Sequence, residues 1–207
     1  MNLFEDENSL EKIVLPMQNA SVCYYPNFYQ ELEALTFQKK IQEETTWQED
    51  DIKLFGKTYK QPRLTALYGD KDKTYSYSNI KMTPNLWTPT LLKIKEDIEY
   101  ITKEAFTTVL LNLYRDGNDS NGWHSDNEKE LGNDPFIASL SFGAKRTFHF
   151  KHKQDTSLKF KIDLGHGSLL VMGGETQTFW KHQIPKSKRV LAPRINLTFR
   201  KIIDGFI

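Results

Sequence analysis

The chain is organised around Asn112-Leu113-Tyr114-Arg115-Asp116-Gly117, which runs into Gly122-Trp123-His124-Ser125-Asp126. Its alternation predicts a strand that leaves an apolar core and enters a polar loop. His124 and Asp126 lie two residues apart, and on an extended segment two such side chains point to the same side. Both can therefore reach one metal ion, and a third ligand must come from elsewhere in the chain.

The third ligand is one of four other histidines. His182 follows His124 after 58 residues, behind a strand-like segment, whereas His149 and His152 lie in a polar alternating segment and His166 lies between two glycines. Spacing alone leaves all four open, and His182 is the leading candidate. Two histidines and one carboxylate would bind one face of an Fe(II) ion and leave its other face open.

The composition is that of a folded protein without disulfide bonds. Hydrophobic residues make up 38% of the chain and aromatic residues 13%, and Cys23 is its single cysteine. This excludes a cysteine-rich zinc site and fits a reducing compartment. No run approaches the roughly 18 apolar residues of a membrane span, and the acidic N-terminus is no secretory signal. We expect an intracellular soluble monomer, cytoplasmic or nuclear, without a membrane partner.

The periodicity predicts two helices followed by many strands. Apolar residues at helical spacing predict helices over residues 27–44 and 86–102, and an irregular arm precedes them. Alternation around Gly56 predicts a hairpin over 51–59. Strands are expected near residues 106–115, 136–142, 145–152, 158–163, 168–172, 178–183 and 194–201. Many short strands without intervening helices predict a sandwich or barrel, and so a mainly β (α+β) fold.

The last predicted strand has two different faces. Arg194, Asn196, Thr198 and Arg200 alternate with Ile195, Leu197 and Phe199. If the polar face points into a barrel, its two arginines need an anion, because a buried guanidinium must be paired. A dicarboxylate fits, since arginine binds carboxylates in a bidentate way. The alternative is a surface strand with both arginines in water.

Phe55 lies beside the glycine of the predicted hairpin and so near its tip. A large apolar side chain at a tip is either simply exposed, folded back onto its strands, or used as a wedge between stacked bases. A local excess of positive charge follows later in the chain, although the formal net charge is only +1. Residues 176–203 hold seven Lys and Arg residues and no acid, which is usually a solvated face.

Four motifs in order carry a resemblance to a known family. They are Asn112-x-Tyr114-x-Asp116-Gly117, His124-x-Asp126-x-Glu128, Ser139-x-Ser141-Phe142-Gly143-Ala144 and Arg194-x-Asn196-x-Thr198-Phe199-Arg200. From about residue 54 to residue 201 the chain resembles the AlkB family of Fe(II)- and 2-oxoglutarate-dependent dioxygenases. It is most similar to the branch that repairs duplex DNA, whose finger hairpin resembles Phe55-Gly56-Lys57 with Pro62-Arg63.

The resemblance implies a double-stranded β-helix, a jelly-roll barrel, over residues 106–207. Residues 1–105 would form an N-terminal extension and a nucleotide-recognition lid packed on it, within one compact domain. It implies Fe(II) ligation by His124, Asp126 and His182. It also implies a site for 2-oxoglutarate, whose expected residues are Asn112, Tyr114, Arg194, Thr198 and Arg200, supported by Asn196.

The resemblance implies oxidative demethylation of bases such as 1-methyladenine and 3-methylcytosine in DNA, with duplex DNA favoured over single strands or RNA. The residues expected to bind substrate are Phe55, Gly56, Lys57, Arg63, Tyr75, Tyr77, Asn127 and Glu128. Asn127 and Tyr77 depart from the branch's usual residues, which leaves the choice of lesion open.

Three other functions stay open at this stage. The same chemistry could act on RNA or on a protein side chain, but a wedge at Phe55 would be pointless on a peptide. A non-catalytic jelly-roll binding module would be expected to lose one of the ligands or arginines. A zinc hydrolase would give Arg194 and Arg200 no task.

Overall fold

The computed structural model describes residues 10–54, 57–71, 75–77 and 80–203. Its helices are α1 (Glu31–Glu44), α2 (Pro89–Thr102) and α3 (Thr176–Phe179), and a 3₁₀ turn spans Lys129–Leu131. The strands before residue 100 are β1 (Ile13–Val14), β2 (Ser21–Tyr25), β3 (Asp51–Leu54), β4 (Lys57–Lys60), β5 (Leu64–Gly69), β6 (Tyr75–Tyr77), β7 (Ile80–Met82) and β8 (Asn85–Leu86). Those after it are β9 (Thr108–Tyr114), β10 (Asn121–His124), β11 (Ile137–Gly143), β12 (Arg146–His152), β13 (Lys159–Leu164), β14 (Ser168–Gly173), β15 (Trp180–Ile184) and β16 (Arg194–Arg200).

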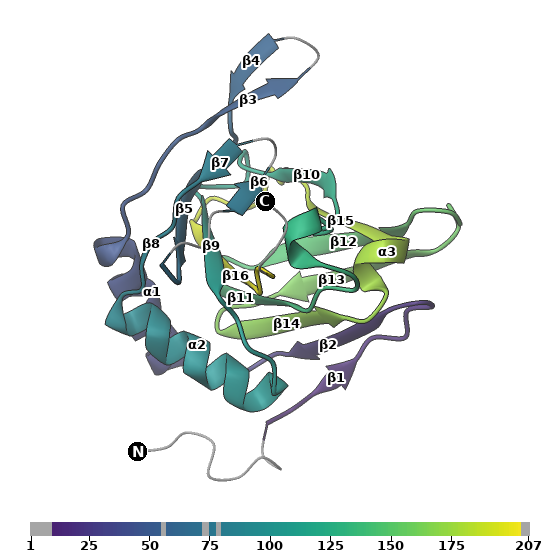
Figure 1. Ribbon diagram of the computed structural model, residues 1–207, viewed down its shortest axis with the longest axis horizontal. Coiled ribbons are helices and arrows are strands. Elements are labelled where there is room, and N and C mark those ends of the chain that lie inside the picture. The colour runs from purple at the N-terminus through teal and green to yellow at the C-terminus, as the bar shows by residue number, and fades with distance from the viewer. Residues whose placement is uncertain (1–9, 55–56, 72–74, 78–79, 204–207) are drawn as a thin grey trace.

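Two sheets form the body of the molecule. The larger has eight strands in the order β1-β2-β14-β11-β16-β9-β5-β8, and the smaller has four in the order β10-β15-β12-β13. Nearly all neighbouring strands are antiparallel, with β5 and β8 the parallel exception. The hairpins β3–β4 and β6–β7 stand apart from both sheets, and β3–β4 projects from the body (Figure 1). This is the mainly β jelly-roll arrangement that the sequence predicts.

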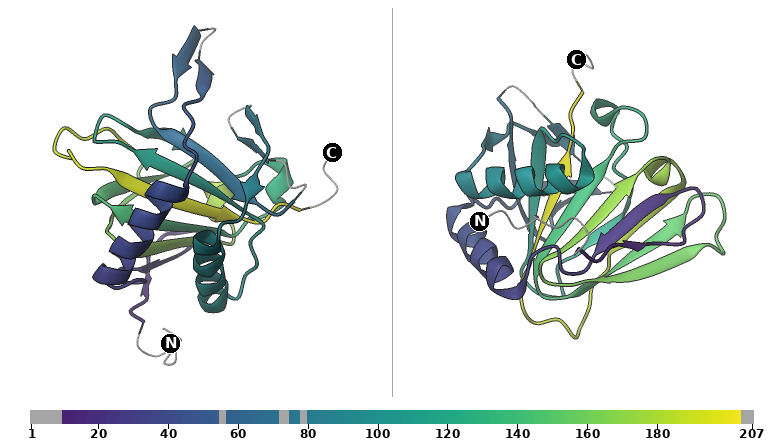
Figure 2. Two further views of the ribbon diagram at one scale, coloured as in Figure 1. Left: turned by 90° about the vertical axis from the view of Figure 1, so that its left-hand side faces the viewer. Right: turned by 90° about the horizontal axis from the view of Figure 1, so that it is seen from below.

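The apolar side chains form two cores, one on each side of the large sheet. Helices α1 and α2 cover its outer face (Figure 2) and pack on Ile195, Leu197 and Phe199 of β16. The second core lies between the two sheets and includes Leu110, Phe148, Phe150, Leu170, Met172 and Trp180. The alternation predicted for residues 194–200 is therefore confirmed, and its polar face points between the sheets.

Only some of the apolar residues that predict the first helix are buried. Phe28 and Phe37 are buried, whereas Leu32 is 81% exposed and Leu35 is also exposed. The buried positions within the helix, Ala34, Phe37 and Ile41, recur every three or four residues, as a helix face requires. The second helix begins at Pro89, because the Thr88 side chain accepts a hydrogen bond from the Leu91 amide and caps it.

The seven predicted strands are present with small shifts at their ends. The segment expected as a strand over 178–183 is in fact the end of α3 followed by β15. The expected irregular arm contains β2, which pairs along its whole length with β14. The predicted loop at Asn121–His124 is a strand, β10. The hairpin expected over 51–59 is present, but its tip lies outside the described residues.

The N-terminal half is not separate from the large sheet, to which it contributes β1, β2, β5 and β8. A boundary near residue 105 stays a prediction. Within the described part of the chain, no helix combines the length and apolar composition needed to cross a lipid bilayer.

Leu197→Ala tests the importance of the outer core. Leu197 is 0% exposed at the centre of β16, so its truncation should lower the free energy of unfolding by about 2–5 kcal/mol in a urea titration. The matched control is Leu191→Ala, because Leu191 is 85% exposed, and its effect should stay within about 0.5 kcal/mol. Equal losses in the two variants would contradict this account of the core.

Candidate active site

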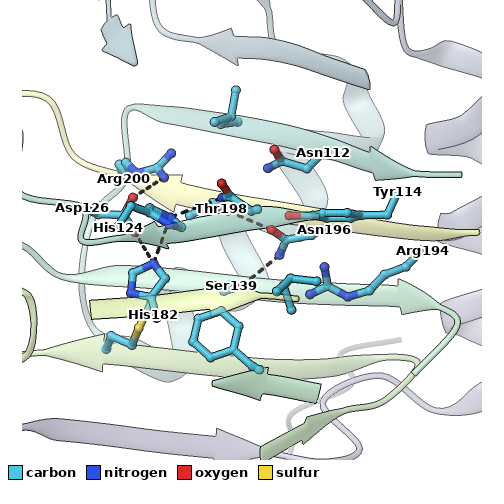
Figure 3. Close-up of a pocket in the computed structure, with 15 residues that line it drawn as sticks. Asn112, Tyr114, His124, Asp126, Ser139, His182, Arg194, Asn196, Thr198 and Arg200 are labelled. Atoms are coloured by element: carbon cyan, nitrogen blue, oxygen red, sulfur yellow. Dashed lines mark hydrogen bonds and ion pairs between the residues drawn. The ribbon is translucent and has the colours of Figure 1, made fainter. Parts of the chain in front are cut away.

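Pairing of β10 with β15 brings the metal-ligand candidates together. His124 lies directly opposite His182 in this antiparallel pair, and their Nε2 atoms are 3.1 Å apart. Asp126 follows two residues later, with its Oδ2 3.6 Å from His182 Nε2. The candidate ligand atoms of the three residues lie within 4.8 Å of one another (Figure 3). Two nitrogens bound to one ion at about 2.1 Å each lie about 3 Å apart when the bonds are at right angles, so the spacing suits a shared ion.

The protonation states of this cluster also suit a metal. Burial lowers the pKa of His182 to about 3 and lowers the pKa of His124. Both imidazoles are therefore neutral at pH 7, as ligands must be. His124 Nδ1 lies 2.8 Å from the Gly122 carbonyl oxygen, which requires the proton on Nδ1 and leaves the Nε2 lone pair facing the cluster.

Asp126 is held at both its side chain and its backbone. Its Oδ1 accepts a hydrogen bond of 2.7 Å from Arg200 Nη2, and its amide donates to Gln177 Oε1 at 3.0 Å. Burial raises the pKa of Asp126, but the Arg200 guanidinium and the two histidines outweigh it and hold the pKa below its usual range. The carboxylate is therefore ionised and ready to bind a cation.

The other three histidines lie apart from this cluster. His166 Nδ1 accepts a hydrogen bond from the Gly143 amide, and His152 Nδ1 accepts from the Asp155 amide in the turn after β12. His149 lies on β12 opposite Lys161 of β13 and Gln183 of β15. Each has a structural environment of its own, and among the described residues only His182 joins His124 and Asp126 in a metal-ligand cluster.

A small cavity opens beside the cluster between the two sheets. The polar face of β16 forms one wall, with Arg200 at the metal end and Arg194 at the other (Figure 3). Apolar side chains of Leu110, Phe148, Met172 and Ile184 line much of the rest. A cavity that is charged at both ends and apolar along its sides suits a small dicarboxylate.

Arg194 is the clearest sign that this cavity holds an anion. It is buried, and its Nη2 donates to Ser141 Oγ at 2.9 Å, while Nε and Nη1 have no hydrogen-bond partner among the described residues. Burial, together with the nearby charge of Arg146, lowers the pKa of Arg194 to about 10. A buried guanidinium with free donors is costly unless an anion neutralises it. A carboxylate of 2-oxoglutarate has the charge and geometry that this position lacks.

The remaining residues expected at this pocket also line it. Asn112, Tyr114 and Thr198 face the cavity, and the Tyr114 ring lies 5.3 Å from the Arg194 guanidinium carbon. Asn196 donates through Nδ2 to Ser139 Oγ at 2.8 Å and accepts from the Thr198 hydroxyl at 3.1 Å. Asn196 thus orients Thr198 toward the cavity.

Arg63, one of the residues expected to bind substrate, is buried at the edge of the cavity. It is 3% exposed, and its Nε donates to Asn112 Oδ1 at 2.7 Å while Nη1 donates to the Ser120 carbonyl at 3.2 Å. Its side chain thus fixes the amide of Asn112 at the edge of the cavity. Its part in substrate binding stays a prediction.

The other expected substrate residues are only partly described. Phe55 and Gly56 lie outside the described residues, and only the backbone is described for Lys57 in β4 and for Tyr75 and Tyr77 in β6. Asn127 is exposed and Glu128 half-buried in the loop after Asp126. Their part in substrate binding stays a prediction.

Sequence reasoning did not single out several residues of this site. Gln177 supports Asp126 from the short helix before β15, and Asn121 lies 3.3 Å from His124 Nε2. Arg146 is buried beside Tyr114 and donates to three backbone carbonyl groups, those of Asp116, Asp119 and Pro185. Ser139 and Ser141 belong to a motif of the resemblance, but no role was expected for them; they contact Asn196 and Arg194.

Comparison with known proteins gives a consistent result. The model of the 2OG-Fe(II) oxygenase superfamily matches residues 21–200. Alpha-ketoglutarate-dependent dioxygenase alkB homolog 3 of Bos taurus is 42% identical over 97% of this chain and 72% of its own length. DNA oxidative demethylase ALKBH2 of Mus musculus is 44% identical over 73% of this chain and 66% of its own length. The solved structure of OsALKBH1 has a TM-score of 0.66 at 15% identity, covering 91% of this chain and 100% of that one, and shows the shared fold.

A Co(II) titration without cosubstrate tests the cluster. His182→Ala should weaken Co(II) binding more than about 100-fold, because even the loss of a group that merely supports a ligand costs about 10–100-fold. His149→Ala is the matched control and should leave the affinity unchanged, since His149 lies on a neighbouring strand outside the cluster. An unchanged affinity in His182→Ala would refute the cluster as a metal site.

Proposed function

The chain belongs to the 2OG-Fe(II) oxygenase superfamily and is an AlkB-type Fe(II)- and 2-oxoglutarate-dependent dioxygenase, and on this basis we propose that it demethylates bases of nucleic acid by oxidation. We infer that its substrates are N-alkylated bases in DNA, such as 1-methyladenine and 3-methylcytosine. The observation that carries the proposal is the ligand cluster of His124, Asp126 and His182 beside a cavity with an arginine at each end. The name of the mouse relative, DNA oxidative demethylase, supports DNA as the substrate.

His124, Asp126 and His182 would hold the iron. Iron, 2-oxoglutarate and O2 together supply the oxidation of an N-methyl group, with succinate, CO2 and formaldehyde as the other products. The chain contributes position and charge balance. Arg200 keeps the Asp126 carboxylate oriented at 2.7 Å, and apolar side chains such as Phe148, whose ring stacks on His182, exclude water from the metal side.

Arg194 would bind the distal carboxylate of 2-oxoglutarate through the two donors that protein atoms leave unused. Tyr114 and Asn112 line the same cavity, and Arg63 holds the Asn112 amide in place through a 2.7 Å hydrogen bond. Because these donors are fixed before the cosubstrate arrives, binding costs little rearrangement of the protein.

A base in a duplex cannot reach this cavity without leaving the stack. We propose that Phe55, between β3 and β4, fills the gap that the extracted base leaves, with Gly56 and Lys57 beside it. Tyr75 and Tyr77 would line the lesion pocket. The projection of the β3–β4 hairpin away from the body supports a contact with duplex DNA (Figure 1).

Asn127 and Glu128 follow the metal ligand Asp126 and would lie near the edge of the extracted base. 1-Methyladenine and 3-methylcytosine are cationic, so the Glu128 carboxylate would favour them over neutral bases where water is excluded. Glu128 would therefore influence which base is bound, and it would have no part in the oxidation itself.

Formaldehyde release from a duplex oligonucleotide with one 1-methyladenine tests the reaction. The wild-type chain with Fe(II), ascorbate and 2-oxoglutarate should release formaldehyde, and His124→Ala should abolish the release because the metal loses a ligand. Phe55→Ala should reduce release from duplex more than from single strands. The absence of release from both substrates would refute DNA repair, and continued 2-oxoglutarate turnover would then direct the search to RNA and protein.

Arg194→Lys tests the cosubstrate site. Lysine keeps the positive charge but loses the planar pair of donors, so the KM for 2-oxoglutarate should rise about 10-fold or more. Arg189→Lys serves as control, since Arg189 is exposed outside the cavity, and its KM should not change. An Arg194→Lys enzyme with the wild-type KM would show that the distal carboxylate binds elsewhere.

A further inference from the structure

The outer face of the four-stranded sheet carries a row of lysines. Lys151 of β12 lies directly opposite Lys181 of β15 on one side and Lys159 of β13 on the other. Directly paired residues point to the same face of a sheet, and here that face is the one turned away from His182. Like charges directly opposite one another destabilise an antiparallel pair. The row therefore has an energetic cost that an anionic partner would remove.

No acidic side chain neutralises this row within the described residues. The ion pair on this face joins Lys145 to Asp163 at 3.4 Å, and no ion pair there involves Lys151, Lys159 or Lys181. The positive charge of the row also affects Lys153, which follows β12. Burial and then Lys181 lower the pKa of Lys153. The face therefore presents uncompensated positive charge to solvent.

Trp123 of β10 lies at the end of the row nearest the active site. It is 37% exposed, and the Lys151 Nζ lies 4.4 Å from the centre of its ring. It directly precedes His124, whose imidazole lines the cavity. An indole ring that is partly open to solvent, with a lysine of the row beside it, can serve as a stacking platform for a nucleic-acid base. This platform is one residue away from a metal-ligand candidate.

A second lysine–aromatic pair, elsewhere in the protein, serves as a comparison for the pair of Lys151 and Trp123. On α2, Lys103 Nζ lies 4.3 Å from the Tyr100 ring, and Tyr100 is 43% exposed. There, however, Lys95 of the same helix is paired with Glu99 at 2.9 Å, so an acidic side chain balances part of the local positive charge. The pair at Trp123 differs in its uncompensated charge and in its position beside the active site.

We propose that the outer lysine face, defined by Trp123, Lys151, Lys159 and Lys181, binds a single strand of nucleic acid outside the cavity. One base stacks on Trp123, and phosphates lie along the lysine row. The inference rests on the proposed function and adds a site for nucleotides that flank the base undergoing reaction. An acidic polypeptide would use the lysines alone and would not need the exposed indole.

Binding of an unmodified single strand of about 15 nucleotides tests this face directly. By fluorescence anisotropy, Trp123→Ala should weaken binding about 5- to 100-fold, and Trp123→Phe, which keeps a ring, should lose less. Lys181→Ala should reduce the slope of log affinity against log salt by about 0.7. Tyr100→Ala and Lys103→Ala are the matched controls and should bind like the wild type.

A comparison of substrate lengths links the face to catalysis. Trp123→Ala should lower kcat/KM on the longer strand with one methylated base but leave it unchanged on a methylated trinucleotide. An unchanged Co(II) affinity would show that the neighbouring His124 is undisturbed. Equal losses on both lengths would overturn the proposal, as would wild-type binding by Trp123→Ala.

Competition separates nucleic acid from other anions. Polyglutamate should displace the oligonucleotide only weakly from the wild type, and equal displacement would identify a general polyanion surface and overturn the proposal. If the wild type releases no formaldehyde from any substrate, the proposed function fails. The anisotropy titration still decides separately whether the outer lysine face binds nucleic acid.

Discussion

The site depends on one buried ion pair, between Asp126 and Arg200. The two groups are 2.7 Å apart, and both side chains are almost completely buried. Removing either partner would leave an uncompensated charge in the interior, which is strongly destabilising. The pair also joins two functions, since Asp126 belongs to the metal cluster and Arg200 belongs to the strand that walls the cosubstrate cavity. At the far end of that strand two donor nitrogens of Arg194 have no hydrogen-bond partner among the described residues, so they can bind an anion.

Strand β16 can serve both core and cavity because it lies deep within the large sheet. It pairs with β11 on one side and β9 on the other, and all seven of its residues are buried. Ile195, Leu197 and Phe199 anchor it to the helices, which fixes the register that turns the polar residues inward. A slip by one residue would move both arginines into the apolar core. The packing of α1 and α2 therefore determines the geometry of a site that they do not touch.

The sequence alone was informative where the residues concerned lie close together in the chain and recur at a regular spacing. Alternation along 194–200 and along the other strands predicted the barrel, and the spacing of His124 and Asp126 predicted a shared ion. Choosing His182 required the resemblance to AlkB proteins, because the pairing of β10 with β15 spans some 58 residues and has no local signal. The position of Arg63 depends on distant residues in the same way. Only the tertiary structure shows its burial and its 2.7 Å contact with Asn112.

The two faces of the four-stranded sheet place different demands on charged side chains. Alternation along β15 turns His182 inward and Lys181 outward, so adjacent residues meet different dielectric environments. Inside, an unmatched charge is costly, so Asp126 has a fixed partner in Arg200, and the donors of Arg194 that have no protein partner favour an anionic ligand. Outside, water screens the lysine row, and its repulsion is small enough to persist without a partner. A ligand bound inside is therefore selected by geometry, whereas one bound outside is held by charge density and stacking, which any nucleotide sequence can satisfy.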